Sequence, residues 1–253
     1  ESDQVGPQLD DAALAWTEDA AARAEAAANW LLADRLFGRA LEVLDDSDDE
    51  RRLAYLLGRA GARLQRWAIN EAGADLDEAD SLTGGRPVAQ ARVDLLRSDL
   101  ERRRGRFERA GRLAGEALEA PVGVGAPAEL AEAYRMQAMI RLFSGAVADA
   151  EQPATQALDL YHRLGNPQGE AWATQHLAWI AFMLGRIEEG ERRIEASVRM
   201  FEAVGDRTGM MWSLGLEANL LFHNGFAEAA AEVAEVVLEE ARLSDHAWAE
   251  GMM

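Results

Sequence analysis

Apolar and small residues recur along this chain with a period of about 39 residues. Three turn phrases beginning at Gly105, Gly145 and Gly185 look alike, and each carries an apolar residue two positions further on. Degenerate copies of the phrase occur three more times. The apolar residues of the six phrases stand 38 to 40 residues apart, at Trp30, Ile69, Phe107, Val147, Ile187 and Phe226. Self-similarity at such a fixed spacing is typical of a repeat protein.

The same register continues beyond each turn. In all six copies the third residue after the turn is small, the seventh is apolar, and the tenth is small or apolar. Offsets of 0, 3, 7 and 10 fall on one stripe of an α-helix. The pattern therefore predicts a helix after every turn, and the small residues predict close approach of a second helix.

A second kind of junction separates one unit from the next. In Leu164-Gly165-Asn166 and Val204-Gly205-Asp206, a Gly follows an apolar residue, as at a helix C-terminus. Asn or Asp then begins the next helix. Each unit is thus expected to contain two antiparallel helices. The predicted pairs are 10–27 with 30–44, 50–65 with 69–82, 88–104 with 107–119, 128–144 with 147–164, 167–184 with 187–204, and 207–223 with 226–243.

These pairs predict an all-α solenoid in which each pair packs on its neighbours. We expect a single domain over residues 1–253. Its predicted repeats lie near 10–45, 50–84, 87–120, 127–164, 166–204 and 206–243. The acidic run 45–50 and the segment 121–127 are expected to be inter-repeat loops. Residues 244–253 have the pattern of a partial seventh unit, so we expect the parent protein to continue.

The turn phrase and the small, apolar and small residues after it resemble the tetratricopeptide repeat (TPR). That family's usual period is about 34 residues, whereas this chain has about 39 and a Gly-Asn or Gly-Asp where the family closes a repeat with Pro. The extended form is similar to helical arrays in large bacterial signal-transduction ATPases, ATPase-linked nucleotide cyclases and transcription activators. The resemblance implies a right-handed superhelix of about 12 helices. It also implies a concave groove, lined by the first helix of each pair, that binds peptides or protein segments.

Composition narrows the classes of function. The net charge of −19 argues against nucleic acid and anionic membranes as main partners, because both need a positive face. No stretch approaches the ~18 apolar residues of a membrane span, and no signal peptide begins the chain. The chain has no Cys, which excludes disulfides and thiolate sites. We expect a cytoplasmic location.

The sequence contains no catalytic or cofactor motif. It has no Lys, so a Walker-type phosphate loop cannot form. The four His are scattered without the spacing of metal ligands. Gly123-Val124-Gly125 lacks the flanking strand of a dinucleotide site and is interpreted as a flexible loop. We therefore expect no enzyme activity, no cofactor and no metal.

The expected groove is formed by the residues eight, twelve and fifteen positions before each turn. In units four to six these positions carry aromatic, Met and Arg side chains, which binding hot spots favour. The candidate groove residues are Arg135, Met139, Trp172, Gln175, Trp179, Met211 and Leu214. The alternative is that Trp and Met at helical spacing only pack between helices.

Six Arg surround the third turn of an otherwise acidic chain: Arg102, Arg103, Arg104, Arg106, Arg109 and Arg112. Such a patch can bind the acidic loop, an acidic segment of the parent chain, or a phosphate-bearing partner. The candidate residues for an anionic partner are Arg102, Arg103, Arg106 and Arg109. The alternative is pairing within the solenoid with Glu101, Glu108 and Glu116. Family grooves that hold a terminal carboxylate use Lys, which is missing here, so that specificity is not expected.

Three functions remain open at this stage. The first is a protein-interaction or sensor module for a protein, a peptide or another domain of the parent chain. The second is a small-molecule effector domain, which a closed, aromatic-lined cavity of several hundred Å³ would favour over an open channel. The third is an enzyme, whose first sign would be a buried His–carboxylate pair. Homodimerisation through the ends of the solenoid is also open.

Overall fold

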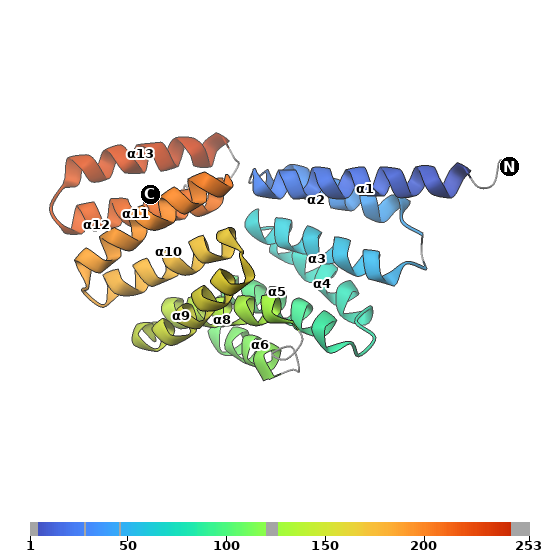
Figure 1. Ribbon diagram of the computed structural model, residues 1–253, viewed down its shortest axis with the longest axis horizontal. Helices are drawn as coiled ribbons and strands as arrows, with labels where there is room; N and C mark the ends of the chain where they lie inside the picture. The colour runs from blue at the N-terminus through green and yellow to red at the C-terminus, as the bar shows by residue number, and fades with distance from the viewer. Residues whose placement is uncertain (1–4, 28, 46, 120–125, 244–253) are drawn as a thin grey trace.

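The computed structural model describes residues 5–27, 29–45, 47–119 and 126–243, and this part of the chain folds into twelve α-helices without a strand (Figure 1). The helices are α1 (Val5–Ala26), α2 (Trp30–Val43), α3 (Asp49–Gln65), α4 (Ile69–Ser81), α5 (Pro87–Arg103), α6 (Phe107–Glu119), α8 (Pro127–Phe143), α9 (Val147–Leu164), α10 (Pro167–Met183), α11 (Ile187–Val204), α12 (Arg207–His223) and α13 (Ala227–Leu243).

The predicted all-α fold of helix pairs is confirmed. Every predicted helix is present, and each bound lies within one residue of its expected place except the start of α1. That helix begins at Val5 rather than at residue 10, with Pro7 in its first turn, where a helix tolerates Pro. The partial seventh unit and most of the loop 121–127 lie outside the described residues. The assignment of residues 1–253 to one domain stays a prediction.

Among the described residues, five of the six turns inside helix pairs have a left-handed residue. Gly105, Gly145, Gly185 and Gly225 have φ between 73° and 88°, which costs Gly little because it has no Cβ. The second unit has Trp67 at this place, with φ of 59°. The periodic Gly residues of the sequence therefore lie at turns between helices. The second copy of the phrase is degenerate because Trp67 takes the place of Gly at its turn.

The core is a series of clusters between neighbouring helices. The small residues three positions after the turns, Ala33, Ala72, Ala110 and Ala150, are fully buried. At Gly190, the fifth such position, an added Cβ would lie 3.5 Å from backbone atoms of Ala178 and Phe182 in α10. This stripe lets the two helices of a pair pack closely, as its spacing predicted.

The stack of pairs curls until its first unit meets its last. In Figure 1 the pair α1 and α2 lies end to end with the pair α12 and α13, and α5 and α8 lie below them. The indole Nε1 of Trp30, at the start of α2, donates a hydrogen bond to Thr208 Oγ1 of α12 at 3.2 Å. The first helices of the later pairs therefore face a common centre. In the described part of the chain, no helix combines the length and apolar character needed to cross a bilayer.

Candidate functional site

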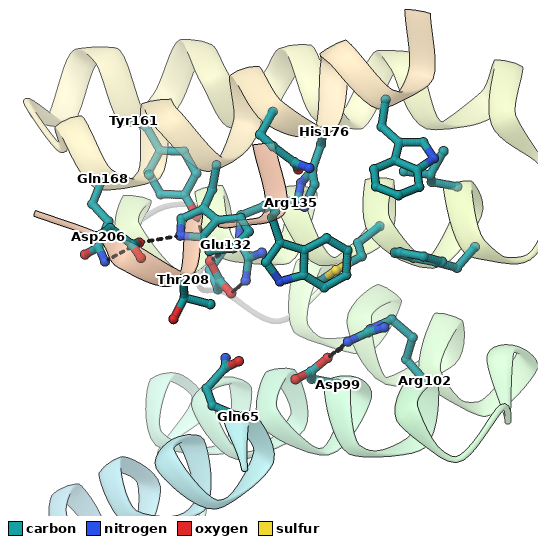
Figure 2. A pocket seen from close by; sticks show the side chains of 18 of the residues that line it. Gln65, Asp99, Arg102, Glu132, Arg135, Tyr161, Gln168, His176, Asp206 and Thr208 are labelled. Atoms are coloured by element: carbon teal, nitrogen blue, oxygen red, sulfur yellow. Dashed lines mark hydrogen bonds and ion pairs between the residues drawn. The ribbon is translucent and has the colours of Figure 1, made fainter. Parts of the chain in front are cut away.

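A cavity of about 380 Å³ lies at the centre of the curled solenoid (Figure 2). All six helix pairs contribute to its lining. One lining residue from each pair, in chain order, is Trp30, Gln65, Asp99, Arg135, Trp172 and Trp212. Residues that lie as far as 182 positions apart in the sequence, such as Trp30 and Trp212, are thus brought to one site. The volume is in the lower part of the ~300–1,000 Å³ range of ligand pockets.

One part of the lining is a ring triad of Phe143, Trp179 and Trp212. Their ring centroids lie 6.1 to 6.3 Å apart, in tilted and edge-to-face arrangements that aromatic pairs prefer. Trp172 lies nearer the start of α10 than Trp179, with its ring edge-on to Phe201 at 5.1 Å. Helices α8, α10 and α12 therefore present flat apolar surface to the cavity.

Asp99 of α5 holds two guanidinium groups at the cavity. Arg102 donates from Nε at 2.9 Å and from Nη2 at 2.6 Å to Oδ1, and Arg103 donates from Nε to Oδ2 at 2.9 Å. Burial by itself raises the pKa of Asp99, but the charges and hydrogen bonds of Arg103 and Arg102 outweigh it and hold that pKa well below its usual range. Arg102 also lies 5.4 Å from the centre of the Phe143 ring. The carboxylate is ionised and fully engaged.

Glu132, Arg135 and Tyr161 form a second, partly buried polar cluster. Arg135 grips both carboxylate oxygens of Glu132, with Nε 2.8 Å from Oε2, and the Tyr161 hydroxyl donates to the same Oε2 at 2.7 Å. Burial by itself lowers the pKa of Arg135, but the charge of Glu132 more than compensates and raises it. The guanidinium is therefore charged and held rigidly in the wall.

Asp206 links the fifth and sixth pairs. It caps α12, because its Oδ1 accepts the backbone N–H of Gly209 at 2.8 Å. Its Oδ2 accepts from Trp172 Nε1 and from Gln168 Nε2, both at 3.0 Å. The residue predicted to begin this helix therefore also fixes the orientation of the Trp172 indole. Figure 2 shows Asp206 beside Gln168 in the wall of the cavity.

Two polar side chains of the wall have unused hydrogen-bonding atoms. Gln175 Nε2 and His176 Nδ1 are buried, and within the described residues neither makes a hydrogen bond. The two side chains are 1% and 4% exposed. Burial, followed by the nearby charges of Arg135 and Arg102, lowers the pKa of His176 well below its usual value, so its imidazole is neutral. Unpaired buried polar atoms are costly, which makes them candidates for contact with a ligand.

The structure brings five of the seven candidate groove residues together. Arg135, Met139, Trp172, Gln175 and Trp179 all line the cavity. Met211 and Leu214 do not. They pack with Val237 between α12 and α13, as in the packing alternative, so these two residues do not line this cavity. The solenoid's curl turns a different stripe of α12 inward, which presents Trp212. A binding role for the five remaining residues stays a prediction.

The candidate Arg patch divides between two places. Arg102 and Arg103 face the cavity through Asp99, whereas Arg106 and Arg109 lie 3.2 and 3.9 Å from the carboxylate of Glu101. Asp99 and Glu101 are two positions apart on α5 and so point to different sides of that helix. The four Arg therefore do not form one surface, and pairing within the solenoid, the alternative stated above, holds for Glu101.

Sequence reasoning missed Trp30, Trp212 and Thr208 as cavity residues. They reach the cavity because unit one meets unit six, and a repeat pattern carries no signal for that encounter. Asp206 had a signal, since it was predicted to begin a helix, but its contact with Trp172 depends on the packing of α10 on α12.

An apolar groove adjoins the cavity. It has a volume of about 470 Å³ and shares Gln65, Asp99, Ala128, Glu132 and Arg135 with the cavity wall. Its apolar members are Leu57, Leu64, Leu95, Leu96 and Met136. The ionic residues of α5 and α8 therefore stand between two apolar subsites, one aromatic and one aliphatic. Among the described residues, no group of three or more acidic or His side chains is placed to hold a metal ion.

No family model and no curated protein matches the sequence. Solved structures do match the fold. A Rap protein complexed with competence and sporulation factor superimposes with a TM-score of 0.71 at 11% identity, over 86% of this chain and 60% of that one. A signal-transduction ATPase with a TPR sensor from Pyrococcus horikoshii gives 0.65 at 17% identity, over 86% and 33% of the two chains.

A putative kinesin light chain with TPR-like repeats from Podospora anserina gives a TM-score of 0.53 at 14% identity, over 79% of this chain and 99% of that one. The TPR-like helical solenoid predicted from the repeat pattern is thus confirmed as the fold. This chain spans 60% of the Rap protein's length and 33% of the ATPase's.

Proposed function

We propose that this chain is a binding module that holds a peptide or a segment of another protein in its central cavity. The observation that carries the proposal is that every helix pair contributes residues to the cavity wall. A ligand there contacts the whole solenoid at once, so binding changes the balance between curled and open forms of the stack.

The structural neighbours support this proposal. One of them, the Rap protein, was solved with competence and sporulation factor, and another carries its repeats as a sensor in a larger ATPase. By analogy, we propose that this chain serves as the sensor or scaffold part of a larger bacterial signalling or transcription regulator in the cytoplasm. Its partner is then a peptide, another protein, or a domain of the parent chain.

The adjoining groove favours an extended ligand. A chain laid across Asp99 and Arg135 can place one side chain in the aromatic subsite and another among the leucines of α3 and α5. Alternate apolar pockets along a backbone path are how grooves obtain specificity for peptides. A small-molecule effector is the second candidate, and the aromatic lining and several-hundred-Å³ volume of the cavity support it.

Binding, rather than catalysis, is also favoured by the state of the cavity's polar groups. Among the described residues, His176 makes no hydrogen bond to a carboxylate, and the acidic groups of the wall are held by Arg, Tyr and Trp donors. Without a His–carboxylate pair or a nucleophile beside a base, the wall provides positions for contact and none of the usual arrangements for proton transfer.

Selection of peptides from a random display library tests the proposal. Peptides chosen on the wild-type chain are expected to quench or shift its Trp fluorescence and to bind Trp179→Ala and Trp212→Ala at least about tenfold more weakly, as truncation of hot spots does. Phe222→Ala is the matched control, because Phe222 is a 70% exposed aromatic residue outside the cavity. Arg135 is unsuitable for this test because its loss removes the cationic partner of Glu132. Selected peptides that bind the Trp variants and the wild type equally well would refute the proposal.

A further inference from the structure

The charges of the cavity wall cancel. Its described lining residues include three cations, Arg102, Arg103 and Arg135, and three anions, Asp99, Glu132 and Asp206, beside a neutral His176. The pairs are formed within the wall: Arg102 and Arg103 with Asp99, and Arg135 with Glu132. The wall therefore has a net charge of zero, although two Arg share Asp99 and Asp206 accepts only from uncharged N–H donors.

Every carboxylate oxygen of the wall already accepts a hydrogen bond, so none is free to pair with a cationic group of a ligand. Both oxygens of Asp99 accept from Arg, both oxygens of Glu132 accept from Arg135, and both oxygens of Asp206 accept from N–H donors. The face of Phe143, which would attract a cation, is already occupied by Arg102. A cationic side chain would have to displace one of these partners.

An anionic group is disfavoured for a matching reason. Each Arg of the wall already donates to a carboxylate, with Arg102 and Arg103 sharing Asp99, so an added anion must compete with Asp99 or Glu132 for these donors. The net charge of −19 on the chain also repels anions at long range.

The hydrogen-bonding atoms of the wall that have no partner belong to neutral side chains. Gln175 Nε2 is an amide donor, and the neutral imidazole of His176 has Nδ1 without a partner. Both lie on α10, the helix that also carries Trp172 and Trp179. A peptide amide has one donor and one acceptor and no charge, so it can satisfy this pair beside an aromatic surface.

We propose that the central cavity selects an uncharged segment: an aromatic side chain lies against Phe143, Trp179 and Trp212, and the peptide amide next to it hydrogen-bonds Gln175 and His176. This inference rests on the proposed function and defines the chemistry of its ligand. Segments with a charged group at that position are excluded from the cavity.

Three probes with the same side chain test the selection. N-acetyl-phenylalanine amide is neutral, N-acetyl-phenylalanine is anionic, and phenylalanine amide is cationic at about pH 6, below the ~7.7–8.0 pKa of an α-amino group. Titration followed by Trp fluorescence is expected to give saturable binding of the neutral probe. The two charged probes should bind at least about tenfold more weakly, a difference of about 1.4 kcal/mol.

The role of the amide is tested separately. Gln175→Leu keeps the size of the side chain and should weaken the neutral probe by about two- to tenfold, as the loss of one hydrogen bond does. Gln152→Leu is the matched control, since Gln152 is exposed and outside the cavity. The methyl ester of N-acetyl-phenylalanine lacks the terminal amide N–H and should bind the wild type more weakly than the amide, which gives a readout that needs no variant.

Equal binding of the three probes, tighter binding of a charged probe, or no binding of the neutral probe overturns the inference. The proposed function is still tested separately by display selection, because selected peptides can occupy the cavity through other contacts. If neither the selected peptides nor the neutral probe binds in the cavity, the cavity is not a ligand site.

Discussion

The Nε1 of Trp30 lies 3.2 Å from Oγ1 of Thr208, and this hydrogen bond joins the first helix pair to the sixth. The two pairs are not neighbours in the stack, so the usual packing of one repeat on the next does not hold them together. The bond also sits at the cavity, since both residues line it. Closure of the solenoid and completion of the binding site are therefore the same event.

Thr208→Val should open this junction without unfolding the chain. It keeps the shape of the side chain and removes an acceptor worth about 0.5–1.5 kcal/mol. Because the chain has no Cys, spin labels can be attached at Arg39→Cys on α2 and Glu228→Cys on α13. Pulsed electron resonance should show a broader distance distribution that extends to longer distances, with unchanged helical circular dichroism. Thr155→Val, at an exposed threonine, is the control, and an identical distribution in Thr208→Val would contradict this role.

Asp99→Asn should destabilise the chain strongly at neutral pH. Two buried guanidinium groups lose their anion, which costs about 3 kcal/mol, the lower end for a broken buried pair. The folded-state pKa of Asp99 is depressed, so its contribution is complete above the unfolded pKa of ~3.9 and is lost as pH falls below it. The difference in unfolding free energy between wild type and variant should thus shrink from about pH 5 to pH 3.

Urea unfolding at several pH values measures that difference. Asp159→Asn is the control, because the Asp159 side chain is 64% exposed. A difference that stays constant down to pH 3, or one no larger than that of the control, would show that the Asp99 pairs contribute little.

His176→Gln should make the stability of the chain less sensitive to pH. The folded-state pKa of His176 is lowered, by burial and by Arg135 and Arg102, so its neutral form contributes stability above the unfolded pKa of ~6.5. That contribution falls by up to about 1.4 kcal/mol for each pH unit below this value. Between about pH 7.5 and 5.5 the wild type should lose more unfolding free energy than His176→Gln. His162→Gln, at a 79% exposed side chain, should retain the wild-type slope.

Two Gly→Ala substitutions should have opposite effects on stability. A Cβ at either Gly185 or Gly115 would meet no atom within 4 Å, so packing does not distinguish them. Gly185 has φ of 75°, where an L-residue costs roughly 1–2 kcal/mol, and Gly185→Ala should lower the unfolding free energy. Gly115 lies inside α6, and Gly115→Ala should raise it by about 0.5–1 kcal/mol. Thermal and urea unfolding check both signs, and a shared sign would contradict the turn assignment.

The helices were predictable because their signals are local. The turn at Gly185 and the cap at Asp206 each depend on a few adjacent residues, and these placed α11 and α12 at their observed bounds. The start of α1 was missed because no turn or cap precedes it in the repeat register. The interior of the groove was predictable in units four and five, where Arg135 of α8 and Trp179 of α10 follow the stripe of the first helix.

The rest of the site depends on how far the stack curls. That curvature is the sum of small rotations between pairs, and it decides whether Met211 or Trp212 faces the centre. It also decides that Trp30 arrives beside Thr208. Neither outcome is encoded at a fixed sequence spacing. The partition of the Arg cluster was likewise hidden, since it depends on the buried positions of Asp99 and Glu101 on different sides of α5.

A crystal structure of the chain with a peptide selected on it tests the central claim most directly. The account predicts peptide density in the cavity, with an uncharged aromatic side chain against Trp179 and Trp212 and a main-chain amide bonded to Gln175. Density at the exposed turn edge near Phe222, or a cavity filled only by solvent while the peptide lies elsewhere, would contradict it.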